Sequence, residues 1–202
     1  MKTKLLRADE PEAVAEAADL LRHGHLVVFP TDTLYGVGAD AFNEAAVDRL
    51  YQAKQRDLAK GIPILLADVA DLDRVVAEVT AEAGWLIERF WPGPLTLVLP
   101  KSDRLPANLS PNEGVAVRIP DHEIARQVIR AAGGAVATSS ANVSGRPPAR
   151  TVQEAMVALA GVVAAVLDGG PAERGVASTV LDCTVRPPRL LRAGPVDIDG
   201  QD

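Results

Sequence analysis

The sequence is poor in aromatic residues and cysteine, and it has no long apolar run. Aromatic residues make up only 3% of the 202 residues, and Cys183 is the single cysteine. One cysteine can neither form an internal disulfide nor supply a multi-cysteine metal cluster. No stretch of about 18 consecutive apolar residues occurs, so a transmembrane helix is not expected. With 48% hydrophobic residues, the chain is expected to fold around an ordinary apolar core.

Basic charge is also in short supply. The chain has 27 Asp and Glu residues against 21 Lys and Arg residues, a formal net charge of −6 at pH 7. Proteins that bind nucleic acid over a broad surface are usually basic and offer aromatic platforms, so this class is the weaker interpretation. A local anion site remains compatible with the acidic total. The first ten residues are polar and charged, unlike a secretion signal, and with the lone cysteine they predict a cytoplasmic protein without a membrane partner.

Several common catalytic patterns are missing. The sequence has no phosphate-binding P-loop, no His-Glu-x-x-His and no nucleophile elbow, and Gly36-Val37-Gly38 lacks a third glycine at the dinucleotide-binding spacing. The three histidines are scattered, so direct metal ligation by the protein is not predicted. We interpret His122 as a solvated surface residue and Cys183 as a small buried apolar residue.

Hydrophobic periodicity and turn residues predict alternating helices and strands. A helix is expected from Asp9, with a capping box to Glu12, up to Gly24. Further helices are expected over 43–53, 71–79, 81–90, 121–132 and 151–160, with Thr80, Asp121 and Thr151 as N-caps. Strands are expected over 25–29, 62–67, 95–99, 115–119, 135–138, 162–167, 178–182 and 189–192, and loops over 30–38 and 101–113. The order predicts one α/β domain with a mixed sheet over residues 1–194 and a flexible tail over 195–202.

Polar and cationic residues gather where predicted strands end, which is where open α/β sheets hold ligands. Residues 30–38 offer hydroxyls, a carboxylate and glycines, either for a small ligand or for a turn that satisfies its own backbone. Residues 54–60 hold three cations, either for a polyphosphate or as a solvated helix end. Arg118 lies in an apolar strand and needs an anion, which a ligand carboxylate or a structural Asp or Glu could supply. Residues 138–145 could bind phosphate oxygens or a hydrated metal, or form a turn.

Seven short motifs follow one another along nearly the whole chain. They are Pro-Thr-Asp-Thr-x-Tyr-Gly-x-Gly-Ala (30–39), Lys-x-Arg-x-x-x-Lys (54–60), Trp-Pro-Gly-Pro-x-Thr (91–96), Val-Ala-Val-Arg-x-Pro (115–120), Ser-x-Asn-x-Ser-Gly (140–145), Ser-Thr-Val-x-Asp (178–182) and Leu-Arg-x-Gly (191–194). Each motif is weak alone, but in this order they resemble the YrdC-type threonylcarbamoyl-AMP synthase family. The resemblance implies an open twisted mixed sheet with flanking helices around a deep cationic cavity.

The resemblance also implies a reaction that joins L-threonine, bicarbonate and ATP into threonylcarbamoyl-AMP and releases pyrophosphate. Magnesium would accompany ATP. The product would pass to a separate threonylcarbamoyl-transferase complex for modification of tRNA, with at most weak tRNA binding by this chain. By the family pattern, threonine would contact Thr33, Arg118 and Ser178. The catalytic cations would be Lys54, Arg56 and Lys60, and the nucleotide would contact Arg56, Lys60, Ser140, Asn142 and Arg192.

The chain departs from the family pattern at a few positions. Asp57 stands where proline often follows the motif arginine, Gly61 stands where proline often follows the motif lysine, and Leu65 lies near a position where some members carry a threonine-contacting histidine. The C-terminal domain of longer relatives has no counterpart in this sequence. The alternatives are a carbamoyl-adenylate-forming relative, which would normally carry zinc-finger cysteines, and a non-catalytic RNA-binding module.

Overall fold

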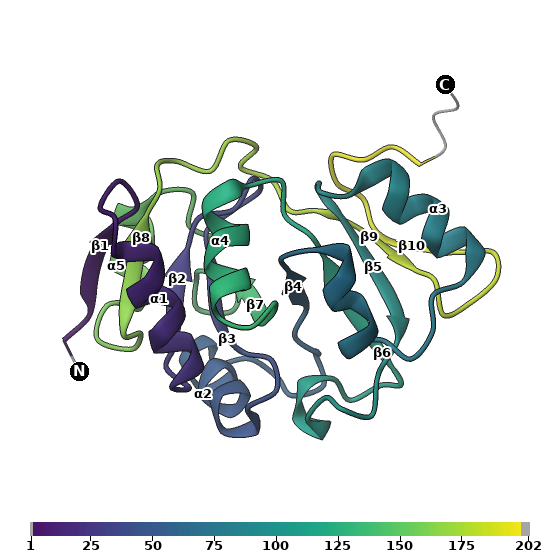
Figure 1. Ribbon diagram of the computed structural model, residues 1–202, viewed down its shortest axis with the longest axis horizontal. Coiled ribbons are helices and arrows are strands. Elements are labelled where there is room, and N and C mark those ends of the chain that lie inside the picture. Colours follow the sequence, from purple (N-terminus) through teal and green to yellow (C-terminus); the bar gives the residue numbers. More distant parts are fainter. Residues whose placement is uncertain (1, 199–202) are drawn as a thin grey trace.

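The computed structural model describes residues 2–198, and its strands form one mixed sheet (Figure 1). In spatial order the ten strands of this part of the chain are β1 (Lys4–Arg7), β8 (Ala165–Asp168), β2 (Val27–Phe29), β3 (Gly36–Asp40), β7 (Ala135–Ser140), β4 (Ile64–Leu66), β6 (Gly114–Arg118), β5 (Leu95–Pro100), β9 (Thr179–Asp182) and β10 (Arg189–Arg192). Four of the strand pairs are parallel (β1–β8, β2–β8, β4–β6 and β5–β9) and the other five are antiparallel. This confirms the predicted α/β domain with a mixed sheet.

Helices flank the sheet where the apolar periodicity predicts most of them. They are α1 (Ala13–Arg22), α2 (Glu44–Lys54), α3 (Ala81–Phe90), α4 (Glu123–Ala131) and α5 (Val152–Leu159), with short 3-10 helices η1 (Val69–Arg74) and η2 (Ala107–Leu109). The predicted caps of α3 and α5 are confirmed, because the Thr80 and Thr151 hydroxyls accept the N–H groups of Ala83 and Glu154. Within residues 2–198, no helix is both long and apolar enough to span a bilayer.

Helix boundaries differ from the sequence expectations at three places. The first helix starts at Ala13 rather than Asp9: the Asp9 carboxylate accepts from the Arg7 guanidinium instead of capping a helix, and Glu12 makes no side-chain capping bond. The segment expected as a helix over 71–79 is the 3-10 helix η1, whose capping box starts it at Asp68 and which ends before Val75. The N-cap of α4 is His122, not Asp121.

Two strands were not expected from the sequence. One is β1, whose side chains are mostly exposed and therefore give little apolar signal. The other is β3, which begins at Gly36 inside the predicted loop 30–38 and pairs with β2 and β7. The approach is close at this point, because a Cβ on Gly36 would lie 2.7 Å from a methyl carbon of Thr138. Glycine permits that contact.

The two faces of the sheet bury alternate residues of each strand, as pleating requires. Val27 and Phe29 of β2 pack in one apolar cluster with α1 and α4, whereas Val28 packs in another with α2 and α5. Helices α1 and α4 lie side by side over β8, β2 and β7 (Figure 1). The chain thereby covers both faces of the first half of the sheet.

The second half of the sheet is different, because one of its faces lines a cavity. The register places Leu65 of β4 beside Arg118 of β6, and Val180 of β9 beside Thr96 of β5. Ala116 lies two residues before Arg118 and so points to the same face. All five of these residues line the same cavity. The face that α1 and α4 cover elsewhere is therefore the one that carries the candidate site.

The segment after β10 is attached to the domain as far as Ile198. The Thr179 hydroxyl donates to the Val196 carbonyl and accepts the Val196 N–H, both at 3.0 Å, and Val196 and Ile198 pack against the core. The flexible tail expected over 195–202 thus begins with residues that make defined contacts. Residues 199–202 lie outside the described part of the chain.

Candidate functional site

The loop after β2 forms a turn that aims two polar side chains inward. The Thr31 hydroxyl accepts the N–H groups of Thr33 and Leu34, both at 3.2 Å, and donates to the Leu34 carbonyl at 2.6 Å. Thr31, Asp32 and Thr33 are all buried. The self-satisfying turn and the ligand loop, considered as alternatives from the sequence, are therefore compatible: the turn orients Asp32 and Thr33.

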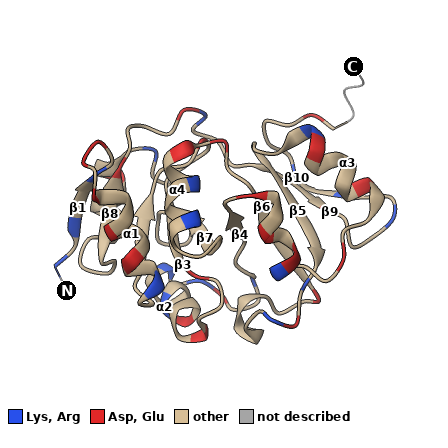
Figure 2. Ribbon diagram, viewed as in Figure 1, with Lys and Arg blue, Asp and Glu red and all other residues tan. Residues whose placement is uncertain are grey.

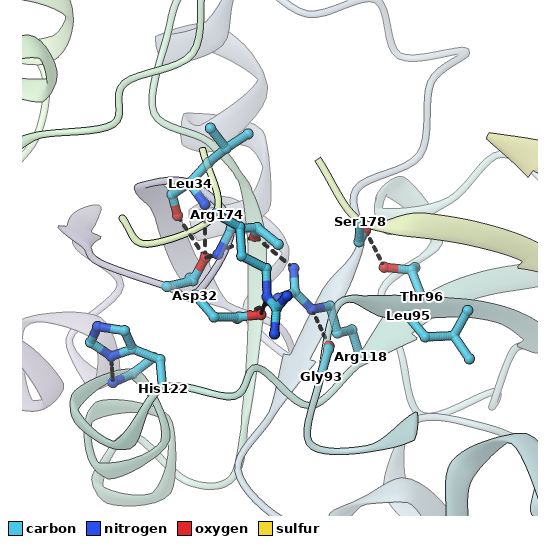
Figure 3. A network of polar contacts seen from close by, with 12 residues as sticks. Asp32, Leu34, Gly93, Leu95, Thr96, Arg118, His122, Arg174 and Ser178 are labelled. Atoms are coloured by element: carbon cyan, nitrogen blue, oxygen red, sulfur yellow. Dashed lines mark hydrogen bonds and ion pairs between the residues drawn. The ribbon is translucent and has the colours of Figure 1, made fainter. Parts of the chain in front are cut away.

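Arg118, at the end of β6, is a buried cation of the site (Figure 3). Its Nε donates to the Gly93 carbonyl at 2.8 Å, Nη1 donates to the Thr33 hydroxyl at 2.8 Å, and Nη2 forms an ion pair with Asp32. Burial lowers the pKa of Arg118, and the Asp32 carboxylate opposes this shift. The anion that the sequence requires for Arg118 is thus a structural carboxylate, that of Asp32. These contacts use three of the five N–H donors of the guanidinium, which leaves two for a ligand.

Ser178 links the strand ends next to Arg118. Its hydroxyl lies 2.8 Å from the Thr96 hydroxyl and accepts from Arg192 Nη2 at 3.0 Å, while Arg192 Nε donates to the Ser178 carbonyl at 2.9 Å. The residues just after β10 lie close to Thr179: a Cβ on Gly194 would lie 2.3 Å from the Thr179 nitrogen. Ser178 and Arg192, which are weak signals individually in the sequence, form one hydrogen-bonded unit.

Lys54, the last residue of α2, is buried rather than exposed at a helix end, with only 1% of its surface accessible. Its Nζ donates to the carbonyls of Ser140 and Asn142 and, at 3.0 Å, to the Asn142 side-chain oxygen. Burial lowers the pKa of Lys54 to about 8, and the neighbouring Arg56 charge adds to this. Lys54, the first lysine of the 54–60 motif, therefore fixes the position of residues 140–142.

Arg56 and Lys60 occupy the loop that follows α2. Arg56 donates to the carbonyls of Lys60 and Gly61, both at 2.9 Å, so its guanidinium closes the loop on itself. Gln55 between α2 and this loop has a positive φ of 48°, which turns the chain at the helix end. Lys60 is exposed. The loop brings both cations to the segment that Lys54 holds.

All nine residues predicted for the site line two hollows that meet. The first, which we call the Arg118 cavity, has a volume of about 330 Å³ and is lined by Thr33, Arg56, Arg118, Ser140, Asn142, Ser178 and Arg192, with Leu65, Thr96 and others. The second, the Lys60 cleft, has a volume of about 470 Å³ and is lined by Lys54, Arg56, Asp57, Lys60, Ser140, Asn142 and Ser144, among others. Arg56, Ser140 and Asn142 line both. The roles predicted for these residues remain predictions, but their juxtaposition is a property of the fold.

Three residues that the sequence reading did not place in the site lie beside it. Asp32 is the partner of Arg118, and the sequence contains a signal for such a partner, since a buried arginine requires an acceptor. Arg174, from the loop between β8 and β9, reaches Asp32 and has no such signal. His122, expected at the solvated surface, is half-buried instead: its Nδ1 accepts the Ala125 N–H at 3.4 Å, and burial lowers its pKa. Cys183 is buried as expected, and burial raises its pKa to about 11.

Metal ligands do not cluster in the described part of the chain, where no group of three His, Cys, Asp or Glu side chains could hold an ion. Basic and acidic residues are interspersed along the elements (Figure 2). The Lys and Arg residues that line the two hollows are Lys54, Arg56, Lys60, Arg118 and Arg192.

Comparison with known proteins places these features in a family. The profile of the Sua5/YciO/YrdC family, described as telomere recombination, matches residues 19–194. Threonylcarbamoyl-AMP synthase from Pyrococcus abyssi is 42% identical over 184 residues, covering 91% of this chain and 54% of the relative; the protein of that name from Bacillus subtilis is 41% identical over 96% of this chain and 56% of the relative. This chain thus spans little more than half the length of these two relatives. A threonylcarbamoyl-AMP synthase from Vibrio cholerae is 36% identical and is covered over 98% of its length.

Comparison with solved structures leads to the same family. The P. abyssi Sua5 complexed with L-threonine superposes with a TM-score of 0.91 at 41% identity, over 95% of this chain and 57% of that one. E. coli YciO shares the fold, with a TM-score of 0.85 at 22% identity over 98% and 97% of the two chains. The family profile and the near-full-length Vibrio relative together show that this chain belongs to the Sua5/YciO/YrdC family.

Proposed function

We propose that this chain catalyses the formation of threonylcarbamoyl-AMP from L-threonine, bicarbonate and ATP, with release of pyrophosphate. The observation that carries the proposal is the junction of the two hollows: a buried, preoriented arginine in one, two loop cations in the other, and Arg56, Ser140 and Asn142 shared between them. Such a junction suits a reaction between an amino-acid derivative and a nucleotide. The relatives named threonylcarbamoyl-AMP synthase, and the neighbour bound to L-threonine, support the same assignment.

In this proposal, the amino acid occupies the Arg118 cavity. Its carboxylate accepts the two N–H groups of Arg118 that are not used by the protein, and Thr33 and Ser178 provide hydroxyls at either side. Because Arg118 is held by Gly93, Thr33 and Asp32 before any ligand binds, little side-chain entropy is lost on binding. The cavity therefore favours a small carboxylate of defined orientation.

The triphosphate occupies the Lys60 cleft. Arg56 and Lys60 supply positive charge to the phosphates, and Ser140 and Asn142 supply hydrogen-bonding groups, while Lys54 adds its charge from beneath. Arg192, held by Ser178, completes the nucleotide contacts from the Arg118 cavity. Grouping cations where negative charge must approach and leave is the usual requirement of phosphoryl and nucleotidyl transfer.

The chemistry needs no protein nucleophile. Bicarbonate and the threonine amine form an N-carboxylate (a C–N bond forms and water is lost), and one carboxylate oxygen then bonds to the α-phosphorus as the bond to pyrophosphate breaks. Arg56 and Lys60 offset the repulsion between the carbamate and ATP and stabilise the leaving pyrophosphate. The rest of the rate acceleration comes from the orientation of the two reactants by the residues shared between the hollows. This agrees with the absence of Ser-His and Cys-His pairs from the sequence motifs.

Magnesium fits the cleft as a companion of ATP rather than as a resident ion. The lining offers one carboxylate, Asp57, with hydroxyl and amide groups, and Asp57 already accepts the Ala59 N–H at 2.9 Å. Such a donor set suits an ion bound mainly by phosphate oxygens and water. When bound, magnesium would neutralise part of the triphosphate charge. The residues present are compatible with that role.

The proposal includes the setting of the reaction. The product would pass to a threonylcarbamoyl-transferase complex that modifies tRNA in the cytoplasm, and direct tRNA binding by this chain would be weak because its charge is acidic overall.

The test is a reaction of the purified chain with ATP, magnesium, bicarbonate and L-threonine, read by mass spectrometry for threonylcarbamoyl-AMP and by release of pyrophosphate. Product is expected only when both threonine and bicarbonate are present. Product without threonine would favour a carbamoyl-adenylate-forming enzyme. No adenylate product, with tight and salt-sensitive tRNA binding, would favour the RNA-binding module instead.

A further inference from the structure

Asp32 has one oxygen whose environment the proposed function leaves unexplained. The side chain is 2% exposed; Oδ1 pairs with Arg118, but Oδ2 is buried without a hydrogen-bond partner among the described residues. A buried carboxylate oxygen without such a partner is costly, and an uncompensated carboxylate beside Arg118 would also cancel the positive charge that a ligand carboxylate needs. Some other group must offset both effects.

Arg174 is placed to do so (Figure 3). Its Nε lies 3.6 Å from Asp32 Oδ2, within ion-pair range but beyond a hydrogen bond, and its backbone N–H donates to the Asp32 carbonyl at 3.0 Å. The same loop is fastened at two more points: the Tyr35 hydroxyl donates to the Gly170 carbonyl at 2.6 Å, and the Ala172 N–H donates to the Arg150 carbonyl at 2.8 Å. The β8–β9 loop is thus fixed to the turn that carries Asp32.

The charges then form a row, Arg118–Asp32–Arg174, with a net charge of +1. Arg118 and Asp32 alone would be neutral. With Arg174 on the far side of Asp32, the row keeps one positive charge while Asp32 fixes the plane of the Arg118 guanidinium. The Arg174 side chain is 42% exposed, so its charge costs less to desolvate than that of Arg118. The substrate carboxylate can therefore bind Arg118, whose guanidinium is oriented by the Asp32 carboxylate.

We infer that Arg174 is a positioning residue for substrate binding, which acts through Asp32 to hold and charge-balance Arg118 for the carboxylate of the amino-acid substrate. The inference rests on the proposed function for the identity of that substrate. Arg174 is not assigned a contact with the substrate. Its contribution is to the affinity for the amino acid, not to the affinity for ATP.

The experiment measures the dissociation constant for L-threonine by calorimetry and the KM values for threonine and ATP. Arg174→Gln should weaken threonine binding about tenfold and change KM for ATP by less than about twofold, because one of the two charges compensating Asp32 is lost. Arg174→Lys should recover part of the affinity. The matched control is Arg7→Gln, which breaks an exposed pair with Asp9, lines neither hollow and should leave threonine binding unchanged.

A double-mutant cycle tests whether Arg174 acts through Asp32. In an Asp32→Asn background, Arg174→Gln should change threonine affinity less than about twofold, since no carboxylate remains to be compensated. An equal loss in both backgrounds would overturn action through Asp32, and unchanged affinity in Arg174→Gln would overturn the inference outright. If Arg174→Gln does not fold, Arg174→Lys carries the test, with a weakening of about threefold expected and unchanged affinity counting against the inference.

The proposed function can fail separately. A wild-type chain that binds L-threonine but forms no threonylcarbamoyl-AMP would overturn the reaction, while the threonine affinities of the variants would still decide the role of Arg174. A wild-type chain that binds no L-threonine would overturn both.

Discussion

The Arg118 cavity and the Lys60 cleft use the same kinds of side chain in opposite ways. In the Arg118 cavity the cation is buried and held by three acceptors of the protein itself. In the Lys60 cleft, Lys60 is exposed and Arg56 is only partly buried, and their charges face an open hollow. A buried and oriented cation selects a ligand by geometry, whereas exposed cations supply attraction that is weakly directional and sensitive to salt.

The comparison also separates two lysines of one motif. Lys54 lies within the protein and bonds to three acceptors of the 140–142 segment, while Lys60 lies at the surface of the cleft six residues later. Helix α2 ends at Lys54, so the two side chains belong to different local structures. We expect substitutions in the two hollows to differ in which substrate they affect and in whether stability changes.

The largest effect is expected from Arg118→Gln. Threonine affinity should fall about a hundredfold or more, and stability should fall by about 3–5 kcal/mol, because Asp32 would be left buried without its main partner. Calorimetry and thermal melts would measure the two. The double variant Arg118→Gln with Asp32→Asn should regain much of the stability but not the threonine binding. Full threonine affinity in either variant would show that the cavity does not bind the carboxylate.

The second effect concerns pH and Lys54. Since the folded pKa of Lys54 is lowered to about 8, its positive charge and third N–H are present below that pH and are lost above it. Activity at saturating threonine should therefore fall about tenfold between pH 7.5 and pH 9.5, because neutral lysine cannot donate to all three acceptors.

Rising pH affects stability in the opposite direction to activity. A lysine whose folded pKa lies below its unfolded value of 10.5 destabilises the fold while it is charged, and this cost is relieved as pH rises from about 8 toward 10.5. The alkaline loss of activity should accordingly occur without a matching loss of stability from this group. A pH–rate profile that stays flat to pH 10, recorded beside melts at each pH, would contradict the assignment.

A smaller effect is expected from Lys60→Ala. It should raise KM for ATP about five- to tenfold with no measurable change in melting temperature, because an exposed lysine makes few contacts of its own. The effect should shrink as salt is raised. Lys4→Ala, which breaks an exposed pair with Glu16, is the matched control and should leave both KM values unchanged. A rise in KM for threonine with no change in KM for ATP would contradict the assignment of Lys60 to the ATP-binding cleft.

The smallest effect is expected at Ser178, which lies in the Arg118 cavity between residues proposed for the two substrates. Ser178 contacts Thr96 on one side and Arg192 on the other, so Ser178→Ala removes a hydroxyl that serves both substrates. Both KM values should rise by about threefold, as for the loss of one neutral or singly charged hydrogen bond. Steady-state kinetics with each substrate varied in turn would test this. If only one KM changes, Ser178 serves a single substrate and its contact with Arg192 does not affect the other.

Prediction from the sequence succeeded where the signal is local. The apolar periodicity located α2 and α3, and Thr80 and Thr151 cap their helices as expected. It failed where non-local contacts decide the outcome. The strand β3 consists of Gly36 to Asp40 and has little strand propensity of its own, but it is held between β2 and β7. The segment expected as a helix over 71–79 is shortened to η1, and an isolated bridge joins Val76 to Lys101 just after it.

The candidate site shows the same division. The family resemblance that the motif order carries implied the nine predicted residues, all of which line the two hollows. The partners of those residues were less predictable. A buried Arg118 demanded an anion, but which carboxylate would supply it depends on the packing of the 30–36 turn against β6. Nothing in residues 169–178 indicated that Arg174 would lie against Asp32, since the two are far apart in the sequence.

By itself, the sequence determined the class of fold, the family resemblance and the residue types available for anion binding, because these follow from composition, periodicity and the order of short motifs. The tertiary structure decided which cations are buried and which are exposed, and therefore which can select a ligand by geometry. Burial depends on strand register and on loops that close over one face of the sheet. Those contacts join residues distant in the chain, and no local pattern specifies them.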